Sequence, residues 1–395
     1  MLDQSTTPAY DIEDAVLNRY QAGAKEHEPS LCCPTEYQDV QYLDVIPDEI
    51  LTKDYGCGDP TRYAKTGDIV VDLGSGAGKN CYMVAQKVGA TGKVIGVDFN
   101  DVMLDLARSY QTEIGEKIGF YNTEYVKGKI QDLKLPLDKL QTWLAENPIT
   151  SVEQITNYET EAERLRDETP LIAADSVDLV ISNCVLNLVK PSDKEQLFQE
   201  IYRVLKKGGR AVISDIVCDE VPTDKIMNDP ELWSGCISGA FLEAEFLQMF
   251  EDAGFYGVEI LSRETEPWQT IDGIEFRSMT LRAYKGKEGV CLERNQAVVY
   301  KGPWAQVKDD DGHTYFRGDR MAVCNKTFNI LTSAEGPYAD QFIPILPFEE
   351  VPLNAAENFN CRVDARRHPK ETKGEDYQVT NFTDGTASCS TDSCC

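Results

Sequence analysis

The chain has 395 residues, 39 of them basic and 67 acidic, so its formal net charge is −28. This excess of negative charge repels nucleic acid and anionic membranes, and its simplest role is solubility. The length suffices for two folded units with a substantial core. No stretch approaches about 18 uninterrupted apolar residues, and the N-terminal residues lack the apolar centre of a signal peptide. A cytoplasmic protein is therefore predicted, with no nucleic-acid or membrane partner.

Thirteen cysteines are scattered along the chain. Their number is odd and they lack the C-x-x-C pairs of a zinc ribbon, so neither a disulfide scaffold nor a zinc ribbon is predicted. Some of them are expected to be small buried apolar residues. The others are candidates for chemistry that needs sulfur.

The N-terminal segment, residues 1–65, is expected to cover a cofactor site formed by the following domain. Apolar residues at helical spacing predict a helix over 12–20, and residues 47–51 favour a second, short helix. The sequence Leu-Cys-Cys-Pro at 31–34 breaks the pattern between them. Residues 55–60, Tyr-Gly-Cys-Gly-Asp-Pro, predict a loop whose two glycines let its cysteine reach a site.

A glycine-rich turn, Asp-Leu-Gly-Ser-Gly-Ala-Gly at 72–78, is the motif around which the chain is organised. It follows an apolar strand at 68–71 and precedes a helix at 79–88, so it is expected at the carboxyl edge of a sheet. Glycines there allow φ > 0 and a close approach of a ligand. The next apolar strand ends in Asp98, whose carboxylate can accept both hydroxyls of a ribose. The motif therefore predicts a nucleotide-like cofactor.

The spacing of the glycines distinguishes between two such cofactors. A dinucleotide-binding turn has the pattern G-x-G-x-x-G. Here the pattern is Asp72, Gly74, Gly76, Gly78, and it resembles the D-x-G-x-G motif of S-adenosylmethionine (SAM) methyltransferases. SAM is therefore favoured over NAD.

Strand-like and helix-like segments alternate over 66–284, which predicts an α/β domain with a doubly wound, mostly parallel Rossmann-like sheet. Residues 132–170 are polar and helix-favouring and are expected to form a surface insertion. The other expected segments are a helix at 102–118, strands at 123–128, 177–184 and 210–217, a helix at 193–205 with Ser192 as its N-cap and Gly208-Gly209 at its end, a loop at 222–239, a helix at 241–253, and strands at 257–261 and 276–284.

The pattern changes after residue 284. Short β-like runs, such as 296–300 and 321–330, predict a small, separate β-rich domain at 285–352. From residue 353 the apolar content falls, and the tail 353–395, which ends in several cysteines, is predicted to be disordered.

Three cysteines are expected to converge at the carboxyl edge of the sheet, where loops face the ligand crevice. Cys184 ends the fourth strand, Cys236 follows the fifth, and Cys57 lies in the glycine loop before the first. Three thiolates around an open pocket suit a soft, thiophilic centre rather than a hard cation. Cys81 and Cys218 are expected to be packing residues.

Four segments resemble the arsenite SAM-dependent methyltransferases: Tyr-Gly-Cys-Gly at 55–58, Gly-Ser-Gly-Ala-Gly-Lys-Asn-Cys-Tyr at 74–82, Ser-Asn-Cys-Val-Leu-Asn-Leu at 182–188, and Gly-Cys-Ile-Ser-Gly-Ala at 235–240. The resemblance extends from about residue 10 to 350. The family's first helix usually begins Gly-Arg-Asp-Cys-Tyr, and Lys79 and Asn80 change the charge here but keep the turn. The insertion at 132–170 is longer than the family leads us to expect.

The resemblance implies a set of site residues. Cys57, Cys184 and Cys236 would ligate As(III), and either Cys32 or Cys33 would pair with Cys57 during turnover. The choice between these neighbours stays open, and both could simply be exposed thiols. Asp98 would take the ribose hydroxyls, with Phe99 against adenine, although Phe99 and Ile130 could instead be core residues. The other implied cofactor-binding residues are Tyr55, Asp72, Gly74, Ser75, Gly76, Ile130, Gln131 and Asn183.

The implied reaction is methyl transfer from SAM to thiolate-bound As(III), which converts arsenite to methylarsenite and leaves a second methylation open. Methyl transfer formally oxidises arsenic, so a cysteine pair would return the two electrons and form a disulfide, which thioredoxin or glutathione would reopen. One alternative is a SAM methyltransferase for a small organic substrate such as a sterol or quinone, which would not need the three cysteines. The other is a non-enzymatic soft-metal-binding protein, which would leave the SAM-like crevice unexplained.

Overall fold

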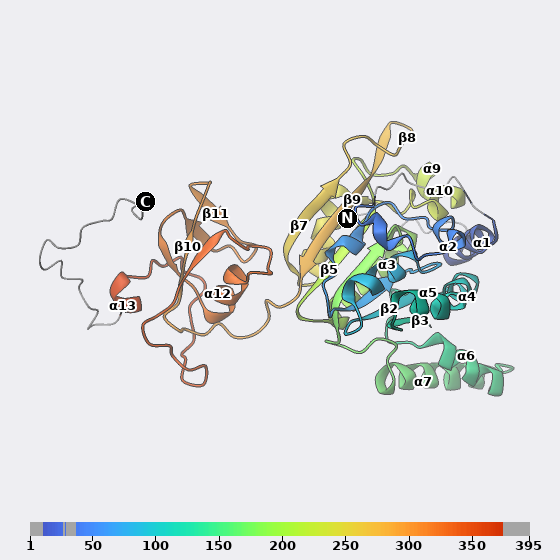
Figure 1. Ribbon diagram of the computed structural model, residues 1–395, viewed down its shortest axis with the longest axis horizontal. Helices are drawn as coiled ribbons and strands as arrows, with labels where there is room; N and C mark the ends of the chain where they lie inside the picture. The colour runs from blue at the N-terminus through green and yellow to red at the C-terminus, as the bar shows by residue number, and fades with distance from the viewer. Residues whose placement is uncertain (1–10, 27, 29–36, 374–395) are drawn as a thin grey trace, which may run out of the picture. The chain divides into compact units, whose positions relative to one another are not determined.

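The structure is a computed structural model that describes residues 11–26, 28 and 37–373 (Figure 1). The chain divides into two compact units, residues 1–286 and 287–395. Within the described residues, no helix combines the length and the apolar character needed to cross a membrane.

The first unit is built on a nine-stranded sheet. Its strands are Ile69–Leu73 (β1), Lys93–Asp98 (β2), Thr123–Lys127 (β3), Val177–Asn183 (β4), Leu205–Cys218 (β5), Phe241–Leu242 (β6), Tyr256–Arg263 (β7), Gln269–Ile271 (β8) and Ile274–Tyr284 (β9). The order is β3-β2-β1-β4-β5-β9-β7, with β6 beside β5 and β8 beside β9. Strands β1 to β5 are parallel, and β9 is antiparallel to β5 and β7. The predicted α/β class with a mostly parallel sheet is confirmed.

Helices cover both faces of this sheet. The helices of the unit are Ile12–Lys25 (α1), Asp48–Leu51 (α2), Lys79–Val88 (α3), Asp101–Ser109 (α4), Gln111–Ile118 (α5), Leu137–Glu146 (α6), Val152–Glu168 (α7), Lys194–Val204 (α8), Asp224–Met227 (α9), Pro230–Ser234 (α10) and Glu243–Asp252 (α11). Apolar residues of α3, α4 and α5 pack on one face, and those of α8 and α11 pack on the other. Burial on both faces explains why the strands are nearly continuous apolar runs.

The register of the sheet brings the carboxyl ends of its strands to one edge. Leu73, the last residue of β1, pairs with Val97 of β2 and Ser182 of β4. Asn183, the last residue of β4, pairs with Ser214 within β5. The turns that follow β1, β2 and β4 therefore lie side by side.

The predicted helix over 102–118 is wrong in one respect, because it breaks at Tyr110 into α4 and α5. The hydroxyl of Tyr82 donates to the carbonyl oxygen of Ala107 at 2.6 Å, and the Tyr110 N–H bonds to the same oxygen at 3.3 Å. That oxygen would otherwise accept the next bond of a continuous helix. A contact from α3 therefore ends α4.

The expected limits of the following helix are also corrected. Ser192 is not its N-cap, because a short 3₁₀ turn at Pro191–Asp193 precedes α8. The helix ends at Val204 rather than at the glycine pair, because the chain already pairs in the sheet at Leu205, opposite Val177. Sheet pairing thus overrides the local helix-stop signal of the glycines.

One segment expected as a loop forms helices, and the segment expected to favour helices does form them. The segment expected as a loop at 222–239 contains α9 and α10. Residues 132–170 form α6 and α7, which bury Leu140, Ala162 and Leu165 between them.

The second unit has two small sheets. Its elements are Ala297–Tyr300 (β10), Gln306–Lys308 (β11), Thr314–Phe316 (β12), Arg320–Ala322 (β13), Asn325–Thr332 (α12), Phe342–Ile345 (β14) and Pro369–Lys373 (α13). The sheet order is β13-β10-β14, and β11 pairs with β12. The β-like run expected over 321–330 is largely helical, because Cys324 caps the N-terminus of α12.

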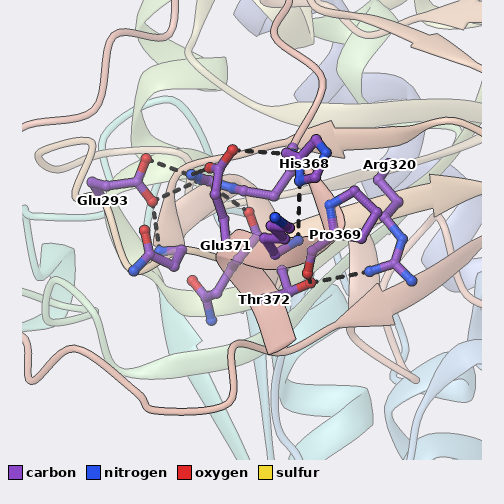
Figure 2. Close-up of polar contacts among 10 residues, drawn as sticks. Glu293, Arg320, His368, Pro369, Glu371 and Thr372 are labelled. Atoms are coloured by element: carbon purple, nitrogen blue, oxygen red, sulfur yellow. Dashed lines mark hydrogen bonds and ion pairs between the residues drawn. The ribbon is translucent and has the colours of Figure 1, made fainter. Parts of the chain in front are cut away.

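The prediction of disorder from residue 353 is wrong for the described part of that segment. Asn358 bridges Leu292, and Arg366 bridges Met321. Arg320 Nη1 donates to Thr372 Oγ1 at 3.0 Å, as Figure 2 shows. Apolar content was a poor guide here, because backbone pairing and ion pairs hold the segment. Residues 374–395, including Cys389, Cys394 and Cys395, lie outside the described residues.

Arg367 makes the principal ion pairs of this segment. Its side chain is 6% exposed and donates to both carboxylate oxygens of Glu293, at 2.7 and 2.9 Å, and to Glu371 at 3.0 Å. The neighbouring Arg366 side chain is 66% exposed and pairs with Asp319. These adjacent arginines form a matched pair for mutation.

We expect Arg367→Ala to lower the free energy of unfolding of the second unit by about 2–3 kcal/mol, because it removes a buried guanidinium and leaves the partly buried carboxylate of Glu293 without its cation. Arg366→Ala should cost less than about 1 kcal/mol, because its ion pair is exposed. Hydrogen exchange of the β10 amides in the full chain measures both changes. Equal effects of the two substitutions would contradict this ranking.

Candidate active site

A cavity lies at the carboxyl edge of β1, β2 and β4. It encloses about 1120 Å³ of space free of protein atoms, counted to its open mouth. This is large enough for a ligand of cofactor size. The predicted site residues that line it are Tyr55, Gly74, Ser75, Gly76, Asp98, Phe99, Ile130, Gln131, Asn183 and Cys184.

The glycine turn forms one wall of the cavity. Gly74 and Gly76 have φ of 70° and 51°, in the left-handed region that favours glycine. A Cβ on Gly74 would lie 2.4 Å from Cγ1 of Val185, whereas a Cβ on Gly76 would meet no atom within 4 Å. Gly76 therefore exposes bare backbone to the cavity, and Gly74 lets the turn lie against the chain that follows β4.

Asp98 lies opposite this turn at the end of β2. Its carboxylate accepts from the N–H groups of Gly76 and Asn100, each at 2.9 Å. Burial raises the pKa of Asp98, and these backbone hydrogen bonds oppose the rise. The carboxylate is thus fixed in place at the cavity wall, where it can accept ligand hydroxyls.

Two buried polar atoms in the cavity wall favour a polar ligand. Ser75 Oγ and Asn100 Nδ2 have no hydrogen-bond partner among the described residues, and both residues line the cavity. Buried groups of this kind are normally satisfied, so a bound molecule is a natural partner. Asn100 was missed by the sequence reasoning. The only local feature that could have indicated Asn100 is its position as the N-cap of α4, which it caps through Oδ1.

Asp72 is placed behind the glycine turn rather than on the cavity wall. Its Oδ2 accepts a hydrogen bond from the Cys81 thiol at 3.2 Å. Burial raises the pKa of Asp72 to about 7. The structure therefore gives Asp72 and Cys81 a supporting position beneath the turn.

Sulfur atoms from distant segments meet beside the cavity. The Sγ atoms of Cys57 and Cys184 and a carboxylate oxygen of Asp215 all lie within 4.8 Å of one another. The Sγ of Cys236 lies 3.1 Å from the carbonyl oxygen of Cys184. All three cysteines are buried in one apolar cluster, with exposed fractions of 3 to 5%.

Two of these cysteines have an unusual backbone conformation. Cys184 has φ of 63° and Cys236 has φ of 62°. A residue other than glycine in this region costs on the order of 1–3 kcal/mol and persists only where its surroundings impose it. Four other non-glycine residues of the described chain have positive φ, but all are Asp or Asn, which tolerate this conformation. Strain of this kind is concentrated at functional sites, which agrees with the sequence motifs that contain the two cysteines.

The Asp215 carboxylate stabilises the backbone that follows the strained residue Cys184. Its carboxylate accepts from the N–H groups of Leu186 and Ile216, each at 2.8 Å. Burial raises the pKa of Asp215 to about 6, and those hydrogen bonds oppose the rise. The sequence reasoning missed this residue. The pattern that could have indicated Asp215 is an acidic residue within the apolar run of the fifth strand.

Asn183 ties the Cys57 loop to the sheet. Its Oδ1 accepts from the N–H groups of Cys57 and Gly58, at 2.8 and 3.1 Å, and its Nδ2 donates to the Gly58 carbonyl at 2.8 Å. A Cβ on Gly56 would lie 2.2 Å from Asn183 Nδ2, and one on Gly58 would lie 2.6 Å from Ser214 Oγ. The glycines beside Cys57 therefore allow a close approach at ordinary φ values.

The N-terminal helix covers the same region. Val16 and Tyr20 of α1 line the cavity, and the Tyr20 hydroxyl lies 4.0 Å from Cys236 Sγ. Arg19 Nη1 bonds to Ser234 Oγ at 3.0 Å, which fixes α1 against the segment that carries Cys236. Cys32 and Cys33, the proposed partners of Cys57, lie outside the described residues.

The fold and this cavity define the class of the protein. Residues 64–173 and 145–254 match a family described as a methyltransferase domain, and residues 287–377 match a domain family of unknown function. The Rossmann-like sheet, the glycine turn and the acid that ends β2 fit the matched methyltransferase domain, so the protein is a SAM-dependent methyltransferase.

More specific relatives narrow this class, and the chain belongs to the arsenite methyltransferase family. It is 30% identical to the arsenite methyltransferase of Mus musculus over 313 residues, which cover 76% of this chain and 73% of the relative. The enzyme of Aquipseudomonas alcaligenes is 29% identical, over 84% and 91% of the two chains. The crystal structure of an arsenic(III) SAM methyltransferase from Chlamydomonas reinhardtii aligns with a TM-score of 0.52 and 26% identity, covering 83% of this chain and all of that one. The family resemblance stated from the motifs is confirmed.

We expect Asn183→Ala to expose Cys57 to alkylation. The substitution removes three hydrogen bonds of about 1 kcal/mol each, so the labelling rate of Cys57 by iodoacetamide should rise at least about tenfold. Asn183→Asp keeps the accepting oxygen and should have a smaller effect. Peptide mass spectrometry after timed labelling measures the rate, and an unchanged rate in Asn183→Ala would show that the loop is held by other contacts.

Proposed function

We propose that this protein methylates trivalent arsenic, using the methyl group of SAM. One observation carries the proposal: the Cys57 and Cys184 thiols lie within 4.8 Å of each other, with the Cys236 thiol against the Cys184 carbonyl, beside a cavity whose lining suits a nucleotide-like cofactor. Membership in the arsenite methyltransferase family supports it independently. The substrate is arsenite, and its first product is methylarsenite.

Arsenite binding is assigned to Cys57, Cys184 and Cys236. As(III) is thiophilic and takes sulfur ligands in place of its hydroxyl groups, each of which leaves as water with a thiol proton. The Sγ atoms of Cys57 and Cys184 are already close together. The Cys236 Sγ lies 3.1 Å from the Cys184 carbonyl oxygen. It must move away from that oxygen to act as the third ligand.

Cofactor binding is assigned to the opposite wall. SAM supplies an electron-poor methyl group on a sulfonium sulfur. Asp98 would accept the ribose hydroxyls, and Phe99 and Ile130 would contact the adenine. Gly74, Ser75 and Gly76 would line the methionine and ribose, and Tyr55, Gln131 and Asn183 complete the lining. Asn100 joins this set through its unpartnered Nδ2.

The reaction depends more on the relative positions of the arsenic and the methyl carbon than on acid–base catalysis. Arsenic held by thiolates keeps its lone pair, which attacks the methyl carbon in line with the departing sulfur, at about 3–3.5 Å in the reactive arrangement. The rigid β4 end, Asn183 and Asp215 supply that positioning for two of the sulfur ligands. Burial of the cysteines excludes water from the arsenic.

A thiol cycle would complete the reaction. Methyl transfer formally oxidises arsenic by two electrons, and two cysteine thiols return them by forming a disulfide and releasing two protons. Cys57 with either Cys32 or Cys33 is the proposed pair. Thioredoxin or glutathione would reopen the disulfide by exchange. The eight cysteines of the described part are all thiols, which fits a reducing compartment such as the cytoplasm.

We expect Cys184→Ser to lower arsenite methylation by about 100-fold or more, because it removes one arsenic ligand, while SAM affinity stays within about twofold. Cys218→Ser is the matched control, since Cys218 is equally buried and its thiol lies 3.3 Å from the Phe241 carbonyl. Product speciation and calorimetric SAM titration measure the two effects. Parent-like turnover in Cys184→Ser would overturn the ligand assignment.

The thiol cycle predicts a stoichiometry. In a single turnover of arsenite and SAM without added reductant, two protein thiols should be lost for each methyl group transferred and kept on trivalent arsenic. Thiol counting with a chromogenic disulfide, alongside arsenic speciation, measures the ratio. Methylarsenite formed without any thiol loss would contradict the cycle but not the methyl transfer.

A further inference from the structure

A second cluster of thiols lies in the unit formed by residues 287–395. The Sγ atoms of Cys291, Cys324 and Cys361 all lie within 4.8 Å of one another. They belong to three segments that are separate in the sequence. No role is given to them by the methyl transfer described above, whose residues all belong to the first unit.

Backbone hydrogen bonds hold the three segments together. The Phe359 N–H donates to the Cys291 carbonyl at 2.8 Å, and the Asn325 N–H donates to the Leu292 carbonyl at 2.9 Å. The segments before Cys361 and after Cys324 are thus both tied to the strand-like stretch that begins at Cys291. The thiols are therefore brought together by the scaffold.

Hydrogen bonds favour the thiolate form of Cys324 more than in a free cysteine. It is the N-cap of α12, and its Sγ accepts from the Thr327 N–H at 3.4 Å and lies 3.2 Å from Thr327 Oγ1. Burial opposes ionisation, but the hydrogen bonds from Thr327 and from the thiols of Cys291 and Cys361 lower the pKa of Cys324. Burial raises the pKa of Cys361, and its hydrogen bonds with the other two thiols add to the rise. The Cys324 sulfur thus lies at the N-terminus of α12, within 4.8 Å of two further thiols.

A ligand can reach the cluster. Cys324 is buried, whereas Cys291 and Cys361 are half-buried. Cys324 and Cys361 line a cleft of about 280 Å³, together with His313, whose Nδ1 is hydrogen-bonded to Asp309 at 2.8 Å. The cleft borders Cys324 and Cys361, and Cys291 is partly exposed to solvent.

Three sulfurs match the coordination of a trivalent metalloid. Structural zinc takes four ligands, and within the part of the chain that the structure describes the cluster offers three ligand atoms, all sulfur. Thiolates also favour a soft centre over a hard cation. As(III) needs three ligands because its lone pair occupies the fourth direction.

We propose that Cys291, Cys324 and Cys361 form a second, non-catalytic binding site for inorganic As(III). Binding exchanges the three hydroxyl groups of arsenous acid for three As–S bonds. Each thiol proton leaves with a hydroxyl group as water, so three waters are released and no oxidation state changes. The site is distinct from the methylation site and goes beyond the function proposed above.

Arsenite binding to the full chain tests the proposal. The tail cysteines are removed first by Cys389→Ser, Cys394→Ser and Cys395→Ser, and this parent is reduced with a phosphine and saturated with sodium arsenite. Bound arsenic per chain is counted by mass spectrometry after desalting. We expect two equivalents in the parent, one in Cys324→Ser, one in Cys184→Ser and none in the double variant. Serine is itself a favourable N-cap, so Cys324→Ser should preserve α12.

Controls separate this site from the methylation site. Cys218→Ser should retain two equivalents, and X-ray absorption of the Cys184→Ser complex should show three sulfur neighbours around arsenic. Two equivalents in Cys324→Ser, or one in the parent and none in Cys184→Ser, would overturn the second site and leave the proposed function intact. One equivalent of zinc in the purified parent that is lost in Cys324→Ser would also overturn it. Two equivalents in Cys184→Ser with one in Cys324→Ser would support the second site and count against the proposed ligands of the first.

Discussion

The hydrogen bonds between Asn183 and the Cys57 loop join the two sides of the proposed arsenic site. Asn183 ends β4, so its position is set by pairing with Ser214 in the centre of the sheet. Its side-chain amide both accepts from and donates to the backbone of the loop. Because Cys184 is the next residue, the same few atoms fix two of the three thiols. Any movement of the loop would separate the Cys57 and Cys184 sulfurs, which are proposed to hold one arsenic atom.

Strain and burial act together around that junction. Cys184 and Cys236 adopt left-handed backbone conformations, and the buried carboxylate of Asp215 supports the first of them by accepting N–H groups from the chain beyond it. An ionised carboxylate in this place is costly, as its raised pKa shows. The surrounding sheet stabilises both the strained backbone and the buried carboxylate. Rigidity is useful to a reaction in which a lone pair must face a methyl carbon in line with its leaving group.

The second unit uses sulfur in a different setting. Cys324 caps a helix through its sulfur, and the thiols of Cys291 and Cys361 lie within 4.8 Å of it. In the first unit the thiols lie beside a cavity suited to a cofactor. In the second they lie beside a small cleft of the unit's own. Sulfur is thus proposed to serve methyl transfer in the first unit and arsenic binding without transfer in the second.

Local patterns determined much of the first unit. The strand–glycine turn–helix sequence at 68–88, the acid at the end of the next strand and the cysteine motifs at 55–58 and 182–188 led to the SAM-methyltransferase fold, the family and most of the cavity lining. They succeeded because a strand end, a tight turn and a helix start are decided by residues close together in the chain. Tyr82, which ends α4 from a neighbouring helix, has no such local signature.

The tertiary structure alone decided the features that join distant segments. Asn183 and Cys57 are 126 residues apart, Arg367 and Glu293 are 74 apart, and the thiols of Cys291 and Cys361 meet only when their segments pair. Residue composition indicated disorder after residue 353 because it counts apolar side chains and cannot count backbone pairing or an ion pair. The sequence by itself determined which chemical groups the chain carries and the local turns that present them. Which groups meet depends on sheet register and packing, because these are set by contacts across the whole fold.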